Sequence, residues 1–199
     1  MANKHTQAKM RKIKLQMQIT LDGFVCGANG EMDWMLWDWD EVLRNYVIDL
    51  TNSADTILLG RKTGEGMAVY WPTVASNPES KEEDLFMADK LSDTAKVVFS
   101  KTVSAINWTN VRVAGNIAEE VKKLKQQPGR DILIYGGAGI VASFIKENLI
   151  DEYHLFLNPT AIGNGKPIFS ELDDTLKLKL VKSTTSSVGI VVLFYEQER

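Results

Sequence analysis

One short segment constrains the fold more than any other: Gly136-Gly137-Ala138-Gly139 separates two apolar runs. The run before it, 132–135, is typical of a buried strand, and the run after it, 140–145, of an amphipathic helix. Glycine has no Cβ and lets a ligand approach the backbone, while the first N–H groups of a helix attract anions. The segment therefore predicts a strand, a turn that can bind phosphate and a helix, although the same turn could serve tight packing alone.

A second glycine turn repeats this pattern. The apolar strand 55–60 ends at Gly60 and is followed by Arg61-Lys62-Thr63, two cations and a hydroxyl at the expected start of a helix. A third strand, 96–100, ends in Ser100-Lys101. Because ligands of open α/β sheets bind beyond the carboxyl ends of the strands, three such ends favour an extended ligand with several phosphates. A solvent-exposed helix start is the alternative interpretation of the second turn.

Strands and helices alternate along most of the chain. The apolar spacing predicts strands at 13–20, 55–60, 96–100, 111–114, 131–135, 152–157, 176–185 and 188–196, and helices at 38–52, 81–91, 117–124 and 139–149. Residues 70–79, which contain two prolines, are predicted to be irregular and to form an insertion, a lid or a dimer contact. The sum is an α/β fold whose sheet is parallel in its middle and antiparallel at its end.

Size and composition limit the class of protein. A chain of 199 residues fits one domain, expected at 13–199, after a flexible basic tail at 1–12. The formal net charge of −3 argues against nucleic acid as a partner, and no apolar run approaches the roughly 18 residues of a membrane span. With a single cysteine, Cys26, and two histidines, we expect no metal site and a cytoplasmic location.

In their order and spacing, these motifs resemble the dihydrofolate-reductase-like fold, and specifically the reductase (C-terminal) domain of the riboflavin-biosynthesis protein RibD and its stand-alone relatives. The resemblance spans about residues 13–196. It rests on Leu21-Asp22-Gly23-Phe24-Val25, Asn29-Gly30-Glu31, Asp33-Trp34, Leu59-Gly60-Arg61-Lys62-Thr63, Tyr135-Gly136-Gly137-Ala138-Gly139, Leu149-Ile150-Asp151-Glu152, Pro159, Gly163-Asn164-Gly165-Lys166 and Phe169. It implies a three-layer αβα homodimer that reduces a small heterocyclic substrate with NADPH, the family's reference substrate being the ribosylaminopyrimidine of the riboflavin pathway.

The resemblance also implies site residues. The cofactor would contact Val25, Gly60, Arg61, Lys62, Thr63, Ser100, Lys101, Gly136, Gly137, Ala138, Gly139, Ile140 and Val141. Of these, Arg61, Lys62 or Lys101 would favour the 2′-phosphate of NADPH, and Trp34 and Asp22 would contact the substrate. The deaminase half of RibD is absent, because the chain has no His-x-Glu with Pro-Cys-x-x-Cys.

The proton donor is open among three carboxylates. By the same resemblance an acid follows the loop tryptophan, which indicates Asp38 or Asp40, with Asp33 as a rival; Asp38 could instead cap the next helix. The tryptophans of this loop could form a stacking wall for a planar substrate or pack in the core. One departure from the family is Gly64, where an aromatic residue is common, so we expect a wider pocket or a looser helix start. A true dihydrofolate reductase and a non-catalytic NADPH- or pterin-binding protein remain alternatives.

Overall fold

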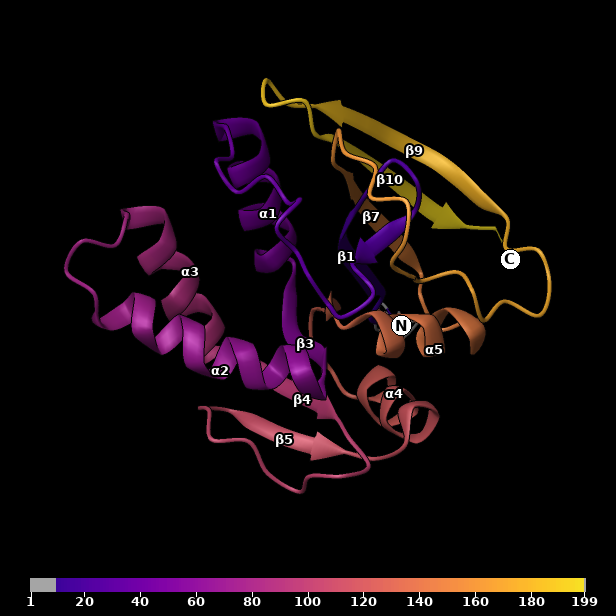
Figure 1. Ribbon diagram of the computed structural model, residues 1–199. Helices are drawn as coiled ribbons and strands as arrows, with labels where there is room; N and C mark the ends of the chain where they lie inside the picture. The colour runs from indigo at the N-terminus through magenta and orange to yellow at the C-terminus, as the bar shows by residue number, and fades with distance from the viewer. Residues whose placement is uncertain (1–9, 199) are drawn as a thin grey trace, which may run out of the picture.

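The architecture is a twisted eight-stranded sheet between two layers of helices (Figure 1). The computed structural model describes residues 10–198, and in this range the strand order of the large sheet is β5-β4-β3-β6-β1-β7-β10-β9. The strands are β1 (Ile13–Ile19), β2 (Phe24–Cys26), β3 (Ala54–Gly60), β4 (Ala95–Phe99), β5 (Val111–Ala114), β6 (Asp131–Gly136), β7 (Glu152–Leu157), β8 (Lys166–Pro167), β9 (Leu178–Thr185) and β10 (Val191–Gln197). All pairs from β5 to β7 are parallel, and β10 pairs antiparallel with β7 and β9, which confirms the predicted sheet.

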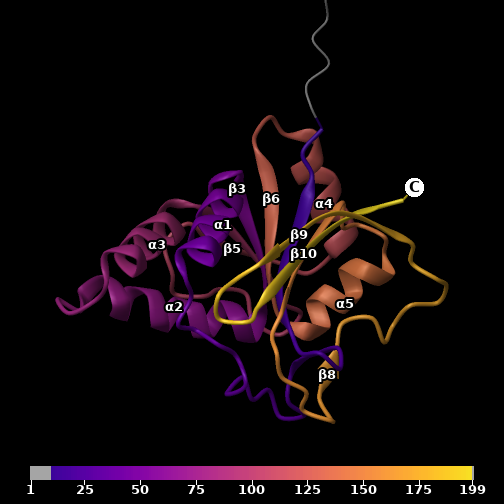
Figure 2. The same ribbon diagram turned by 90° about the horizontal axis from the view of Figure 1, so that it is seen from above.

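Helices cover both faces of the sheet (Figure 2). The helices are α1 (Glu41–Asn52), α2 (Arg61–Ser76), α3 (Glu82–Asp93), α4 (Ile117–Gln126) and α5 (Ala138–Lys146). The first three lie on one face, where Leu59 and Val98 pack with Leu91 of α3. The last two lie on the other face, where Leu58 belongs to the same cluster as Phe144 of α5. Alternate strand residues thus face opposite layers, as expected for a sheet that is buried on both sides.

The segment 70–79, predicted to be irregular, is helical as far as Ser76, and for these residues the prediction is wrong. Only 77–79 are irregular. Proline cannot donate the next helical hydrogen bond, but Pro72 is exposed, so its ring meets water. The hydroxyl of Thr73 donates to the carbonyl of Val69 over 2.9 Å and satisfies a carbonyl of this turn. The small antiparallel sheet of β2 and β8 was not predicted, because two- and three-residue strands show no periodicity.

The packed domain also begins earlier than predicted, since Arg11 and Lys12 of the expected tail are held in place. Arg11 is 5% exposed and donates to the carbonyls of Arg130 and Leu124 and to Asp55. Residues 1–9 of that tail lie outside the described residues. No helix within residues 10–198 is long and apolar enough to cross a membrane.

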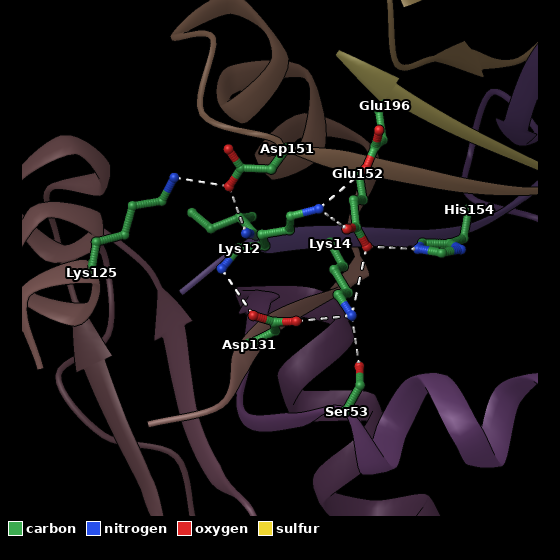
Figure 3. A network of polar contacts seen from close by, with 10 residues as sticks. Lys12, Lys14, Ser53, Lys125, Asp131, Asp151, Glu152, His154 and Glu196 are labelled. Carbon is green, nitrogen blue, oxygen red and sulfur yellow. Dashed lines mark hydrogen bonds and ion pairs between the residues drawn. The ribbon is translucent and has the colours of Figure 1, made fainter. Parts of the chain in front are cut away.

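An ionic network closes the amino-terminal edge of the parallel strands (Figure 3). The carboxylate of Glu152 accepts a hydrogen bond from Lys12 at 2.6 Å and lies 3.6 Å from the ammonium of Lys14 and 3.5 Å from Nε2 of His154. Lys14 also pairs with Asp131 at 2.9 Å. Burial alone would raise the pKa of Glu152, but the contacts with His154, Lys12 and Lys14 outweigh it and lower the pKa from 4.5 to about 2.

Candidate functional site

The two glycine turns lie side by side at the carboxyl edge of the sheet. Gly60 ends β3 and Gly136 ends β6, and these two strands are neighbours. A Cβ built on Gly137 would lie 3.4 Å from Cα of Gly60 and 3.3 Å from the hydroxyl oxygen of Thr63. The two turns, which are about 75 residues apart in the sequence, therefore pack with the backbone of Gly137 against the backbone of Gly60.

Gly136 and Gly137, in the turn between β6 and α5, both adopt a conformation that favours glycine. Gly136 has a φ of 113° and Gly137 a φ of 95°. Side chains with a Cβ rarely adopt such values, so the turn could not keep its shape with another residue. The direction in which β6 enters α5 is thus set by these two glycines.

The helices that start at these turns differ from their neighbours in having neither a side-chain cap nor an acidic residue in the first turn. Helices α1 and α4 are capped by the side chains of Asp40 and Asn116, which accept first-turn N–H groups. Helices α2 and α5 have glycine at the cap position, no side-chain cap and no acidic residue in the first turn. Helix α3 also lacks a side-chain cap, but its first turn carries three acids. Free N–H groups and the helix dipole therefore favour an external anion at α2 and α5 alone among the described helices.

Cationic and hydroxyl groups follow the ends of the neighbouring strands β3 and β4. Arg61, the first residue of α2, is half-buried, and Nη1 donates to both carboxylate oxygens of Glu65 at 2.9 and 2.8 Å. Lys62 and Lys101 are exposed. The hydroxyl of Ser100 accepts from the backbone N–H groups of residues 102 and 103 at 3.1 Å and shapes the loop after β4.

Other predicted cofactor residues have different positions. Ala138, Gly139 and Ile140 form the first turn of α5, and the Ile140 side chain closes the gap between the two glycine turns. Val141 is fully buried in the core and its N–H donates to the carbonyl of Gly137, so neither group is free for a ligand. Val25 is 4% exposed on β2.

The carboxylates after the loop tryptophan have distinct surroundings. Asp40, and not Asp38, caps α1: it accepts from the N–H of Leu43 and from the N–H and hydroxyl of Ser187. These bonds hold the pKa of Asp40 below its ordinary value, and the bond from Leu43 contributes most. Both oxygens of Asp40 thus already accept hydrogen bonds within the protein. Asp33 and Asp38 are exposed on the loop that precedes α1.

Replacing Asp40 by alanine is expected to lower the urea midpoint of unfolding, because α1 loses its N-cap and Ser187 loses its acceptor. Asparagine keeps one acceptor oxygen for the N–H of Leu43 but not the second one for Ser187, so the midpoint of Asp40→Asn should lie between those of the wild type and Asp40→Ala. Urea unfolding of both variants measures the difference. An equal loss in both would mean that the bond to Leu43 does not stabilise this end of α1.

Asp22 connects two loops. Its carboxylate accepts from the hydroxyl of Thr20 at 2.6 Å and from the N–H groups of Ile162 and Gly163 at 3.0 and 2.7 Å. These bonds lower the pKa of Asp22, and the bond from Thr20 contributes most. Asp22, predicted to contact the substrate, therefore already binds the loop after β7 to the end of β1.

The loop tryptophans divide between core and surface. Trp34 is 9% exposed, and its indole N–H has no acceptor among the described residues. Trp39 stacks between Trp37 and the buried Phe156, with ring centroids 6.0 Å apart on each side. Trp37 is 65% exposed, so the outer face of this stack is open to solvent.

Asn158, which binds the tryptophan loop to β1, was not predicted as a site residue. Asn158 is fully buried after β7. Its amide nitrogen donates to Oε1 of Gln18 at 2.6 Å, and its oxygen accepts from the N–H of Leu36 at 3.1 Å. A single asparagine before Pro159 gives no periodic or motif signal, and its partners come from β1 and from the tryptophan loop.

Gly64 does not widen a pocket, contrary to the expectation. It is buried, and a Cβ built on it would lie 2.8 Å from Cγ2 of Val98 and 3.5 Å from Cδ1 of Ile106. The glycine instead lets α2 pack closely on β4, and the start of this helix is not loosened.

Comparison with known proteins agrees with these features. The family model described as the RibD C-terminal domain matches residues 11–192. The uncharacterised protein YyaP of Bacillus subtilis (strain 168) is 38% identical over 187 residues, which cover 94% of this chain and 95% of that protein. The riboflavin biosynthesis protein RibD of Corynebacterium ammoniagenes is 24% identical over 179 residues, 87% of this chain and 51% of that protein.

Solved structures show the same fold at low identity. A Shewanella sp. PV-4 protein provisionally assigned to riboflavin biosynthesis superposes with a TM-score of 0.69 at 22% identity, covering 96% of this chain and 100% of that one. Dihydrofolate reductase from Enterococcus faecalis, complexed with NADP(H), superposes with a TM-score of 0.57 at 16% identity, covering 94% and 97%. The dihydrofolate-reductase-like fold expected from the motifs is thereby confirmed.

Proposed function

Because the chain belongs to the RibD C-terminal domain family, whose members are reductases, we propose that it is an NADPH-dependent oxidoreductase acting on a small heterocyclic substrate. One observation carries the proposal: two uncapped, acid-free helix starts meet at adjacent glycine turns, with Arg61 beside them. Such a surface suits the pyrophosphate of a dinucleotide. A Cβ on Gly60 or Gly137 would lie 3.1 or 3.2 Å from Cγ2 of Ile140, so the two glycines let the turns pack closely and keep both helix starts side by side. The fit to the cofactor rests on the uncapped first turns of α2 and α5.

The chain's own groups would bind and orient the reactants. The first-turn N–H groups of α2 and α5 would hold the pyrophosphate, and Arg61, Lys62 or Lys101 the 2′-phosphate. When bound, the nicotinamide supplies the hydride. Asp33, Asp38 or Asp40 would supply a proton, and Trp34 would contact the substrate with its ring. The reference substrate is 5-amino-6-(5-phosphoribosylamino)uracil.

Titration calorimetry with NADPH and NADH tests the cofactor. We expect NADPH to bind at least ten-fold more tightly, because a cationic site gains from the extra phosphate charge. In the double variant Arg61→Ala, Lys101→Ala this preference should vanish while binding of NADH changes little. If the wild-type protein binds neither nucleotide, the glycine turns are architectural and the proposal fails.

Turnover identifies the branch of the fold family. Under this proposal NADPH is oxidised with the pyrimidine substrate, and not with dihydrofolate. Rapid turnover of dihydrofolate alone would make the protein a dihydrofolate reductase. Nucleotide binding without turnover on a panel of pyrimidines, pteridines and quinones would favour a non-catalytic NADPH- or pterin-binding protein, an alternative motivated by the occupied carboxylate of Asp40.

The proposed setting is a homodimer in the cytoplasm. Apolar side chains are exposed on the outer surface of α2 and α3, where Val69, Tyr70 and Phe86 are 71%, 57% and 43% exposed. A partner subunit would remove this surface from water.

A further inference from the structure

We propose that Glu65 competes with the nucleotide's phosphate for Arg61, and that it thereby limits the protein's preference for 2′-phosphorylated nucleotides. This inference rests on the proposed function. Its starting point is the pair of hydrogen bonds from Nη1 of Arg61 to both oxygens of Glu65. The two side chains are 37% and 42% exposed, so a ligand in solvent can reach the pair.

The position of Arg61 is not explained by helix stability. A cation in the first turn faces the positive end of the helix dipole, which is unfavourable. The order of the pair, with the cation four residues before the anion, is also the weaker of the two orders on a helix. Arg61 therefore adds positive charge where the N–H groups of α2 are already uncapped, and the whole turn attracts an anion.

When no ligand is bound, the carboxylate of Glu65 pairs with the guanidinium of Arg61. A phosphate held by two oxygens on the guanidinium would need the donor that Glu65 now occupies, or would share the guanidinium with it. An exposed pair of this kind is weak, so it can open. The carboxylate nevertheless remains on the neighbouring turn, and its negative charge opposes a phosphate bound to the same arginine.

The size of the effect follows from Coulomb's law. A carboxylate and a phosphate of charge about −1.5, about 6 Å apart in surroundings close to water, change an equilibrium by about five-fold. Removing the charge of Glu65 should therefore tighten binding of a 2′-phosphorylated nucleotide by about five-fold. The affinity for the counterpart that lacks the 2′-phosphate should not change. Because both groups are exposed, the gain should shrink as salt rises from 50 to 300 mM.

The test compares adenosine 2′,5′-bisphosphate with 5′-AMP, and NADPH with NADH, by calorimetry on the full chain. Glu65→Gln keeps the size of the side chain and removes the charge. The matched control is Glu79→Gln, the same charge change at an exposed site beyond the far end of α2. Thermal melts of both variants check that the fold is retained.

A salt-sensitive gain of about five-fold for the 2′-phosphorylated probes, in Glu65→Gln only, would support the inference. Unchanged affinity, an equal gain in the control, or weaker binding would overturn it; weaker binding would mean that Glu65 orients Arg61 for the ligand. If neither NADPH nor the bisphosphate binds to the wild type or the variant, the proposed function itself is wrong, which is a different result.

Discussion

Gly137→Val is expected to abolish nucleotide binding, with a loss of affinity of at least 100-fold, in a protein that still folds. The φ of 95° would strain any residue with a Cβ by about 1–3 kcal/mol. The valine side chain would also push the two turns apart, because its Cβ would lie 3.2 Å from Cγ2 of Ile140 and 3.4 Å from Cα of Gly60. Calorimetry with NADPH, together with a thermal melt of the same sample, measures both effects.

Gly66→Ala is the matched control. Gly66 is an exposed helical glycine of α2, and a Cβ built on it meets no atom within 4 Å. This variant should bind as the wild type does and gain up to about 1 kcal/mol, because alanine is the better helix former. If Gly137→Val bound NADPH with unchanged affinity, the ligand could not lie at the meeting of the two turns.

The elements that sequence predicted well are those whose signals are local. The apolar run of β6, the glycines that follow it and the stripe of α5 are contiguous, so their order alone defines a strand, a turn and a helix. The strands 111–114 and 152–157 were predicted with their observed bounds for the same reason. The contact between Gly60 and Gly137 was not predicted, because it depends on the pairing of β3 with β6, two strands that are far apart in the chain.

What could not be predicted depends on partners far away in the chain. Asp40 caps α1 through the N–H of Leu43, but its second carboxylate oxygen binds Ser187, 147 residues away, and no local pattern predicts that contact. Arg11 was assigned to a flexible tail, but its partners lie 44 to 119 residues away. Pro72 was read as a helix breaker because the tolerance of an exposed proline depends on which face of α2 meets solvent. In each case a tertiary contact, absent from the local pattern, decided the role.

Glu152 shows how such contacts set stability at the end of the sheet opposite to the candidate site. Glu152→Gln is expected to cost about 3 kcal/mol at pH 7, because the variant lacks the charge that pairs with Lys12 and Lys14. The Glu152 side chain is 8% exposed, so water replaces little of what is lost. Urea unfolding gives the difference. The control is Glu196→Gln: Glu196 also contacts Lys12, at 3.1 Å, but is 44% exposed and should matter by less than about 1 kcal/mol.

The same residue predicts how stability responds to acid. The pKa of Glu152 is lower in the folded protein, about 2, than in the unfolded chain, 4.5. Its stabilising contribution is therefore complete above pH 4.5 and is lost as the pH falls from 4.5 towards 2. Between these values the wild type should lose about 3 kcal/mol more than Glu152→Gln, so that the two urea midpoints converge at low pH. Parallel curves for wild type and variant would show that the network stabilises the fold through packing and not through the charge of Glu152.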